Sequence, residues 1–239
     1  MAQRITALVA ALLLPVAQPL LMGTAISGAG LLMVASPSEA QNAEAVARIA
    51  QAITVRIEGA GSPGSGVLVQ RDGNRYTVLT AWHVVSDQKP GEELAIYTPD
   101  GQSHRLEPGS VQRLGQVDLA VLSFSSAKSY GLAILGETTS VPMGSSIYVS
   151  GFPLPTSAVP TRLMRFLEGK VVANATVTIP NGYQLLYSNS TLPGMSGGAV
   201  LNPLAQLVGI HGQGETDSMM SEQEGVAVKT GTNQAVPIN

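Results

Sequence analysis

The chain has no cysteine among its 239 residues. Disulfide bonds are therefore excluded, and the fold must take its stability from a hydrophobic core. Basic residues are also scarce: 13 lysines and arginines stand against 16 acidic residues, without a basic cluster, which excludes a nucleic-acid-binding footprint. The three histidines have no paired spacing, so the sequence predicts no metal site and no cofactor.

Long hydrophobic runs are confined to the N-terminus. Arg4 precedes an almost uncharged stretch, residues 5–34, and Ser38-Glu39-Ala40 places small residues where a signal peptidase reads them. The sequence thus predicts a signal peptide over residues 1–40 and export to the periplasm or the extracellular space. The run exceeds the roughly 7–15 apolar residues usual in such signals, so a retained membrane anchor is the alternative. A membrane partner is expected only in that case.

The remaining chain has the pattern of short strands separated by turns. Residues 53–58 alternate apolar and polar side chains, and residues 67–70 and 76–80 flank the turn sequence 71–74. A short lead-in helix is expected over residues 41–52, and a connection between two halves over residues 126–140. Further strands are predicted at 94–98, 117–124, 146–151, 169–177, 183–188, 198–201, 206–211 and 231–238. This composition indicates β-barrels or a β-sandwich.

Three short motifs supply a base, a carboxylate and a nucleophile. His83 ends Thr80-Ala81-Trp82-His83, Asp118 lies in Val117-Asp118-Leu119-Ala120, and Ser196 lies in Gly194-Met195-Ser196-Gly197-Gly198. A serine hydroxyl is a poor nucleophile near neutral pH unless an imidazole accepts its proton and a third group fixes the imidazole tautomer. The chain offers all three groups in the order His, Asp, Ser.

The surroundings of Asp118 and Ser196 support these roles. A carboxylate among apolar neighbours is costly unless it is hydrogen-bonded, and an imidazole N–H is a natural partner for Asp118. The glycines around Ser196 allow consecutive backbone N–H groups to point to one spot, where an oxyanion forms during acyl transfer. We assign the N–H groups of Gly194 and Ser196 as these donors.

The motif around Ser196 also fits the Gly-x-Ser-x-Gly turn of α/β-hydrolases. That fold needs a helix after the serine, followed by an acid and then a histidine. Here Asn202-Pro203 lies between two strand-like runs, and His211 precedes Asp217. The esterase interpretation is therefore rejected.

The three motifs, together with Gly64-Ser65-Gly66-Val67 before the first hairpin, resemble the bacterial branch of the trypsin-like serine endopeptidases. The resemblance covers residues 53–238 and implies an all-β fold of two six-stranded antiparallel Greek-key barrels with the active site between them. The first barrel, residues 53–125, would carry His83 and Asp118, and the second, residues 141–239, would carry Ser196. The expected substrates are proteins or peptides.

The resemblance also bears on specificity. A trypsin-type preference needs an aspartate six residues before the serine, where this chain has Ser190. Thr191, five residues before the serine, and His211 resemble the substrate-binding pair of glutamyl endopeptidases, in which a hydroxyl and a partly protonated imidazole suit an anionic side chain. This implies an acidic P1 residue bound at Thr191 and His211. The alternative is that His211 only caps a strand end.

Two departures from trypsin concern activation. Met195 replaces the aspartate that pairs with a new N-terminal ammonium in trypsin, and an Ile-Val-Gly-Gly start is absent. The oxyanion loop is therefore expected to be held by packing. The function predicted is an exported serine endopeptidase. An inactive peptide-binding member of the family and a Deg-like stress protease are the alternatives, the latter disfavoured because no PDZ-like segment follows in this sequence.

Overall fold

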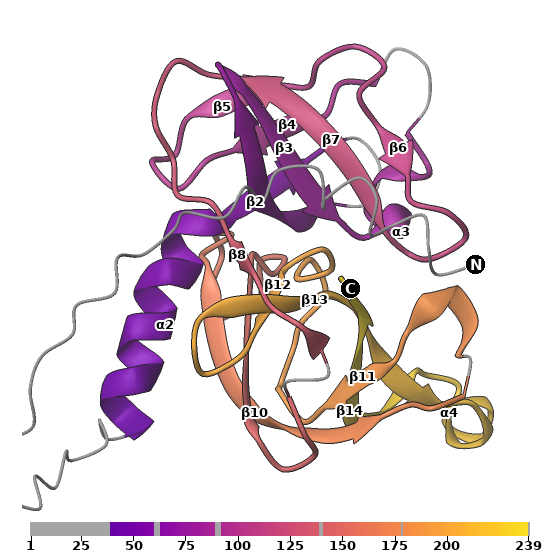
Figure 1. The fold of residues 1–239 in the computed structure, drawn as a ribbon. Coiled ribbons are helices and arrows are strands. Elements are labelled where there is room, and N and C mark those ends of the chain that lie inside the picture. The colour runs from indigo at the N-terminus through magenta and orange to yellow at the C-terminus, as the bar shows by residue number, and fades with distance from the viewer. Residues whose placement is uncertain (1–38, 60–62, 89–91, 139–140, 178, 239) are drawn as a thin grey trace, which may run out of the picture.

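A computed structural model describes residues 39–59, 63–88, 92–138, 141–177 and 179–238, with the backbone alone for 39–42. Two β-sheet units lie next to each other, and one helix runs alongside the second unit (Figure 1). The predicted signal peptide lies almost wholly outside the described residues. No helix in the described ranges is long and apolar enough to cross a bilayer.

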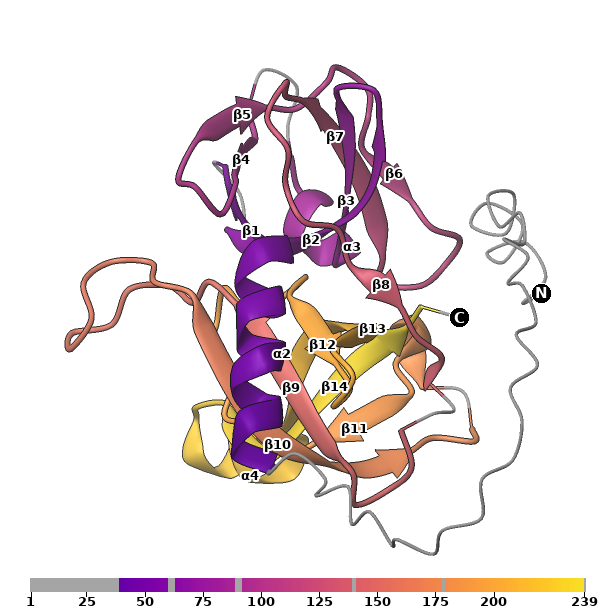
Figure 2. The same ribbon diagram turned by 60° about the vertical axis from the view of Figure 1, so that its left-hand side comes forward.

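The predicted lead-in segment is helix α2 (Glu39–Ile53). Its buried side chains, Val46, Ala50 and Ile53, recur at helical spacing and form one apolar stripe. This stripe faces strands of both units: β2 (Gly64–Asp72) of the first, and β9 (Ser146–Gly151), β10 (Arg165–Asn174) and β12 (Ala199–Leu201) of the second. Figure 2 shows α2 running along the second unit towards β1 (Thr54–Glu58). The helix therefore ties the two units together at the start of the first strand.

The first unit is a seven-stranded antiparallel sheet with the order β5-β4-β1-β2-β3-β7-β6. A two-residue turn at Gly73 and Asn74 joins β2 to β3, and Gly73 has a φ of +57°. The strands are β1 (Thr54–Glu58), β2 (Gly64–Asp72), β3 (Arg75–Thr80), β4 (Ala95–Tyr97), β5 (Ser103–Arg105), β6 (Gln112–Arg113) and β7 (Ala120–Ser125). The short strands β5 and β6 form its two edges and do not pair with each other. The sheet is therefore not closed by hydrogen bonds, and the unit is a half-barrel.

The second unit contains a closed barrel of six strands, since β12 pairs with both β9 and β13 around the ring β12-β9-β10-β11-β14-β13. Its strands are β9 (Ser146–Gly151), β10 (Arg165–Asn174), β11 (Leu185–Tyr187), β12 (Ala199–Leu201), β13 (Gln206–Asp217) and β14 (Val228–Pro237). Strand β8 (Ile134–Leu135), in the predicted connection between the halves, adds a parallel edge to β13. Helix α4 (Ser218–Glu224) lies between β13 and β14.

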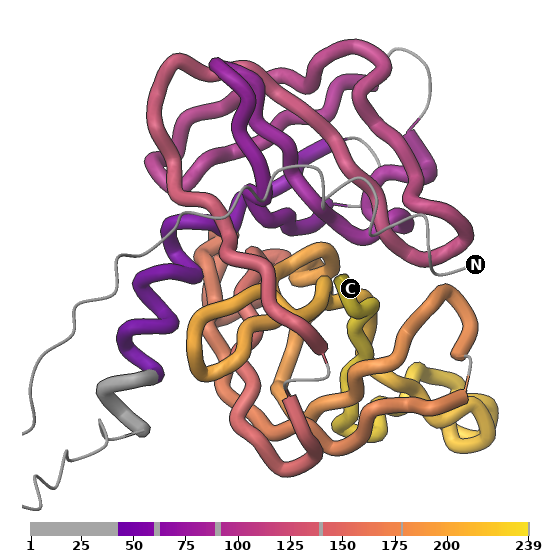
Figure 3. The backbone as a smooth tube through the Cα atoms, in the orientation of Figure 1, coloured from indigo at the N-terminus to yellow at the C-terminus, as the bar shows by residue number. Residues whose placement is uncertain are grey.

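Three hydrophobic clusters fill the molecule. One, with Tyr76 and Phe124, lies within the first sheet, and another, with Tyr187 and Met195, lies within the second barrel. The third contains side chains of α2 and of both units. It lies where the backbone of the first unit approaches that of the second in Figure 3. The predicted all-β, trypsin-like two-barrel fold is confirmed, although the hydrogen bonding of the first unit leaves its sheet open.

Candidate active site

His83 lies in the short helix α3 (Trp82–Val85), which follows β3. Val84 and Val85 are buried and fix the helix to the first core, whereas the His83 side chain is 43% exposed. His83 contacts Asp118 twice: its backbone N–H donates to Oδ1 at 2.9 Å, and its Nδ1 lies 2.8 Å from Oδ2. Two contacts to one carboxylate fix both the position of the helix and the plane of the imidazole.

Asp118 is buried and lies two residues before β7, not within a strand as predicted. Its backbone N–H donates to the carbonyl of Asn181 at 2.8 Å, and the hydroxyl of Tyr183 donates to Oδ2 at 2.6 Å. Burial by itself would raise the pKa of the Asp118 carboxyl, but the hydrogen bonds from His83 and Tyr183 hold this pKa below its usual value. The carboxylate is therefore ionised at neutral pH.

An ionised Asp118 fixes the tautomer of His83. A carboxylate only accepts hydrogen bonds, so Nδ1 must carry the proton in the contact with Oδ2. The other ring nitrogen, Nε2, then has a free lone pair and can accept a proton. The pair has the arrangement of an oriented general base.

Tyr183 is a member of this site that the sequence analysis did not identify. Residue 183 was predicted only as the start of a strand, and it lies in the connection between β10 and β11. Its ring occupies the space beside Gly212, where an added Cβ would come within 2.2 Å of Tyr183 Cε1. Burial, followed by the hydrogen bond to Asp118, raises the pKa of the Tyr183 hydroxyl, which therefore stays a donor.

Ser196 lies in the loop between β11 and β12 and is partly exposed. Its hydroxyl donates to the carbonyl of Gly212 at 2.8 Å, and it makes no hydrogen bond with His83. The structure thus joins His83 to Asp118 and directs the Ser196 hydroxyl to a backbone acceptor. A rotation about the Cα–Cβ bond of Ser196 redirects its hydroxyl without moving the backbone.

The peptide group between Pro193 and Gly194 has a fixed orientation. The carbonyl of Pro193 accepts a hydrogen bond from the N–H of Leu154 at 2.8 Å. Since the carbonyl and the N–H of a trans peptide point in opposite directions, the N–H of Gly194 points away from Leu154. Gly194 has a φ of +91°, which glycine adopts without strain.

The peptide group between Met195 and Ser196 is also fixed by a hydrogen bond to its carbonyl oxygen. The carbonyl of Met195 accepts from the N–H of Gly198 at 2.9 Å, which leaves the N–H of Ser196 on the opposite side. Neither this N–H nor that of Gly194 has an acceptor in the described part of the chain. Two unpaired N–H groups flanking a buried Met195 are suited to stabilise an oxyanion.

Ser65 links this loop to the first sheet and explains the Gly64-Ser65-Gly66 motif. Its hydroxyl donates to the carbonyl of Gly194 at 2.9 Å and accepts from the N–H of Phe152 at 2.8 Å. Its N–H donates to the carbonyl of Ser196 at 2.8 Å. A Cβ at Gly197 would lie 2.1 Å from the Ser65 carbonyl oxygen, so only glycine permits this approach.

In the predicted substrate-binding pair, Thr191 and His211, the threonine hydroxyl and one ring nitrogen of the histidine have partners in the protein. The hydroxyl of Thr191 donates to Oδ1 of Asn233, and Nδ1 of His211 lies 2.6 Å from the hydroxyl of Tyr187. Thr191 and His211 are both buried, whereas Ser190 is exposed. The Thr191 proton is therefore used within the fold, contrary to the expected donation to a substrate.

His211 is neutral in this structure. Burial, with smaller contributions from His83 and Lys229, lowers the pKa of its imidazole to about 3. The expected partly protonated imidazole is therefore wrong for the protein without substrate. Burial raises the pKa of the Tyr187 hydroxyl well above its usual value, so this group keeps its proton. It lies 2.6 Å from Nδ1 of His211 and 3.4 Å from the carbonyl oxygen of Gln234, and it can donate to either. Donation to Nδ1 leaves the His211 proton on Nε2, which has no hydrogen-bond partner among the described residues.

The buried His211 predicts an acid-sensitive fold. Its pKa is near 6.5 in the unfolded chain and lower in the folded protein, so unfolding takes up a proton as the pH falls through this interval. We expect this residue alone to lower the free energy of unfolding by about 2 kcal/mol from about pH 7 to about pH 5. Urea unfolding of the wild type and of His211→Gln at several pH values measures it. Equal pH slopes for the two proteins would contradict the prediction.

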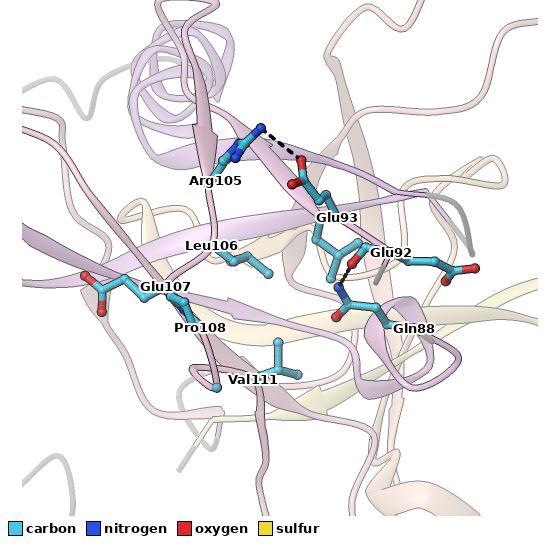
Figure 4. A pocket seen from close by; sticks show the side chains of 10 residues that line it. Gln88, Glu92, Glu93, Arg105, Leu106, Glu107, Pro108 and Val111 are labelled. Atoms are coloured by element: carbon cyan, nitrogen blue, oxygen red, sulfur yellow. Dashed lines mark hydrogen bonds and ion pairs between the residues drawn. The ribbon is translucent and has the colours of Figure 1, made fainter. Parts of the chain in front are cut away.

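A cavity of about 300 Å³ is lined entirely by residues of the first unit, between Gln88 and Val111 (Figure 4). Its lining includes Glu92, Glu93 and Arg105 and none of the predicted site residues. Arg105 pairs with Glu93 at 3.3 Å, and Gln88 donates to the Glu92 carbonyl at 2.7 Å. The Arg105 guanidinium and the Gln88 amide at the cavity are thus bound within the protein. Because His83, Asp118 and Ser196 do not line this cavity, it is not the candidate catalytic site.

Comparisons with known proteins identify the family of this chain. The family described as "Trypsin-like peptidase domain" matches residues 64–210, which include all three motifs. The chain is 26% identical over 183 residues to the serine protease Do-like HtrA of Lactococcus lactis subsp. lactis (strain IL1403), and 26% identical over 182 residues to that of Lactobacillus helveticus. Each match covers 74% of this chain and 42% of the relative. The chain thus spans less than half the length of these curated relatives.

A solved structure has the same fold. The crystal structure of Deg5 superposes with a TM-score of 0.64 at 19% sequence identity, covering 85% of this chain and 91% of that one. At this identity, the likeness concerns the arrangement of the two units.

Proposed function

Because the chain belongs to the family of trypsin-like peptidase domains, we propose that it is a serine endopeptidase in which Ser196, His83 and Asp118 form the catalytic triad. The observation that carries the proposal is the double contact of Asp118 with His83. It orients the imidazole through Nδ1 and leaves Nε2 available to accept a proton, as a general base requires. Relatives named serine proteases support the same conclusion.

The mechanism follows from the positions of the protons. The Ser196 hydroxyl leaves the Gly212 carbonyl, gives its proton to His83 Nε2 and attacks the carbonyl carbon of the scissile bond. The N–H groups of Gly194 and Ser196 stabilise the negative oxygen of the tetrahedral intermediate. His83 then gives the proton to the departing amine, and water hydrolyses the acyl-enzyme by the same steps in reverse. Asp118 stabilises the imidazolium throughout.

Labelling with a fluorophosphonate tests this assignment. We expect a single covalent adduct on Ser196, located by peptide mass spectrometry, and none on the nearby exposed Ser190. Ser196→Ala is the matched control and should remain unlabelled. A folded protein that binds peptides yet forms no adduct would support the alternative of an inactive peptide-binding module.

The Deg-like alternative is favoured by one observation, the similarity to HtrA proteins and to Deg5. It differs from a simple endopeptidase in its substrates. Cleavage of unfolded proteins with little cleavage of the same proteins when folded would support a Deg-like role. Equal cleavage of both forms would exclude it.

An acidic P1 preference is a further part of the proposal. With Tyr187 donating to Nδ1, the Nε2–H of His211 is an unpaired buried donor that suits a carboxylate. Thr191 does not add a second donor, because its proton binds Asn233. A panel of peptides differing only at P1 tests the preference, and equal cleavage after glutamate and leucine would exclude it.

Export is proposed from the sequence of residues 1–40. N-terminal sequencing of the protein recovered from the periplasm or medium should give a chain starting at Gln41. A membrane-bound protein that retains residue 1 would instead support the anchor.

A further inference from the structure

Arg162 is an unusually enclosed cation. It lies in the connection between β9 and β10, which projects from the second barrel in Figure 2, yet only 6% of its side chain is exposed. Its guanidinium is directed inward to the boundary between the two units. Arginine is rarely buried to this degree unless its donors are paired.

Backbone carbonyls surround the guanidinium. From the first unit it binds Ile57 at 3.1 Å and Gly64 at 2.9 Å, and from the second unit Phe152 at 2.5 Å, Pro153 at 3.3 Å and Gly194 at 3.3 Å. Five acceptors from four separate segments thus meet at one side chain. The planar guanidinium, with five N–H groups in a fixed fork, can serve such a set, whereas a lysine ammonium offers only three donors.

The charge of Arg162 has one counterion. Nη1 lies 2.9 Å from Oε1 of Glu58 at the end of β1, and Glu58 also pairs with Arg56 at 3.2 Å. Burial lowers the pKa of the guanidinium and Glu58 opposes this effect, but a guanidinium keeps its proton in proteins. A permanent charge is therefore held against the carbonyl dipoles at this point.

Three of these contacts connect Arg162 to the oxyanion loop. Arg162 binds the carbonyl of Gly194 itself, next to the hydroxyl of Ser65. It also binds the carbonyls of Phe152 and Pro153, the residues just before Leu154, whose N–H holds the Pro193 carbonyl. Both peptide groups that flank Gly194 are thereby linked to one cation.

We propose that Arg162 is a positioning residue that holds the N–H of Gly194 in the orientation for oxyanion binding by fastening the loop to the first unit. This inference rests on the proposed endopeptidase function. Without the cation, the Pro193–Gly194 peptide can turn and direct its carbonyl towards the site of the oxyanion. The oxyanion loop, which was expected to be held by packing, is in this proposal also held by the hydrogen bonds of Arg162.

Kinetics of Arg162→Met and Arg162→Lys test the proposal. We expect Arg162→Met to lower kcat for peptide amides about 10²-fold, the range seen when an oxyanion donor is lost, with little change in KM. Affinity for a peptide aldehyde, whose adduct places an oxyanion in the same site, should fall in parallel. Arg162→Lys keeps the charge with fewer contacts, so it should recover part of kcat.

Phe124→Leu is the control for a general loss of stability. Phe124 is fully buried in the first core and contacts none of the groups that bind Arg162, so the folded fraction of this variant should keep the wild-type kcat. A similar loss of kcat in Phe124→Leu, or wild-type kcat in folded Arg162→Met, would overturn the role of Arg162 and leave the endopeptidase assignment intact. An unreactive wild type would instead refute the proposed function.

Discussion

Replacing His83 with alanine is expected to slow acylation of Ser196 by about 10⁶-fold, the loss seen when the base of a comparable triad is removed. The structure gives the reason. The Ser196 hydroxyl donates to a backbone carbonyl, which is too weak a base to remove the proton. His83, oriented through Nδ1 by Asp118, presents its other ring nitrogen as the proton acceptor.

Single-turnover kinetics with a fluorophosphonate or an activated ester measure this loss. His104→Ala is a matched control, because His104 is an imidazole of the first unit that contacts Tyr130 and Phe124, not Asp118. The control should acylate at the wild-type rate. An unchanged rate in His83→Ala would show that another group activates Ser196 and would remove His83 from the mechanism.

The strand pattern predicted β-barrels or a β-sandwich, and the resemblance to trypsin-like endopeptidases predicted the two-barrel fold that the structure has. Burial of a carboxylate demands a partner, so the apolar neighbours of Asp118 were enough to expect an imidazole beside it, and the structure places His83 there. The orientation of the Ser196 hydroxyl towards Gly212 could not be inferred, because it depends on atomic positions in two distant segments.

No sequence pattern predicted the roles of Tyr183 and Arg162. Tyr183 is 65 residues from Asp118, and Arg162 is 98 residues from Gly64 in the chain. Tyrosine at a strand start and arginine in a loop have no periodicity that distinguishes them from surface residues. Their function follows only from the packing of one unit on the other. The short strand β8 was missed for a similar reason, since two residues carry no alternation.

The expected effect of Asp118→Asn is a loss of about 10⁴-fold in kcat, with a protein that still folds. Asparagine is close in shape to aspartate, but its amide group can donate to Nδ1 of His83. The imidazole then holds its proton on Nε2 and cannot accept one from Ser196. The lost carboxylate also no longer stabilises the imidazolium. Steady-state hydrolysis of a peptide substrate measures kcat, and circular dichroism verifies the fold.

Tyr183→Phe tests whether the hydrogen bond from Tyr183 positions the Asp118 carboxylate, because the variant keeps the charge of Asp118. The variant removes one hydrogen bond of 2.6 Å from Oδ2 but keeps the ring that fills the space beside Gly212. The carboxylate and both contacts with His83 remain, so kcat should fall only about 10-fold, the worth of one hydrogen bond to a charged group. A loss as large as that of Asp118→Asn would mean that Tyr183 fixes the position of the carboxylate. Wild-type activity in Asp118→Asn would instead refute the role of Asp118, whatever the effect of Tyr183→Phe.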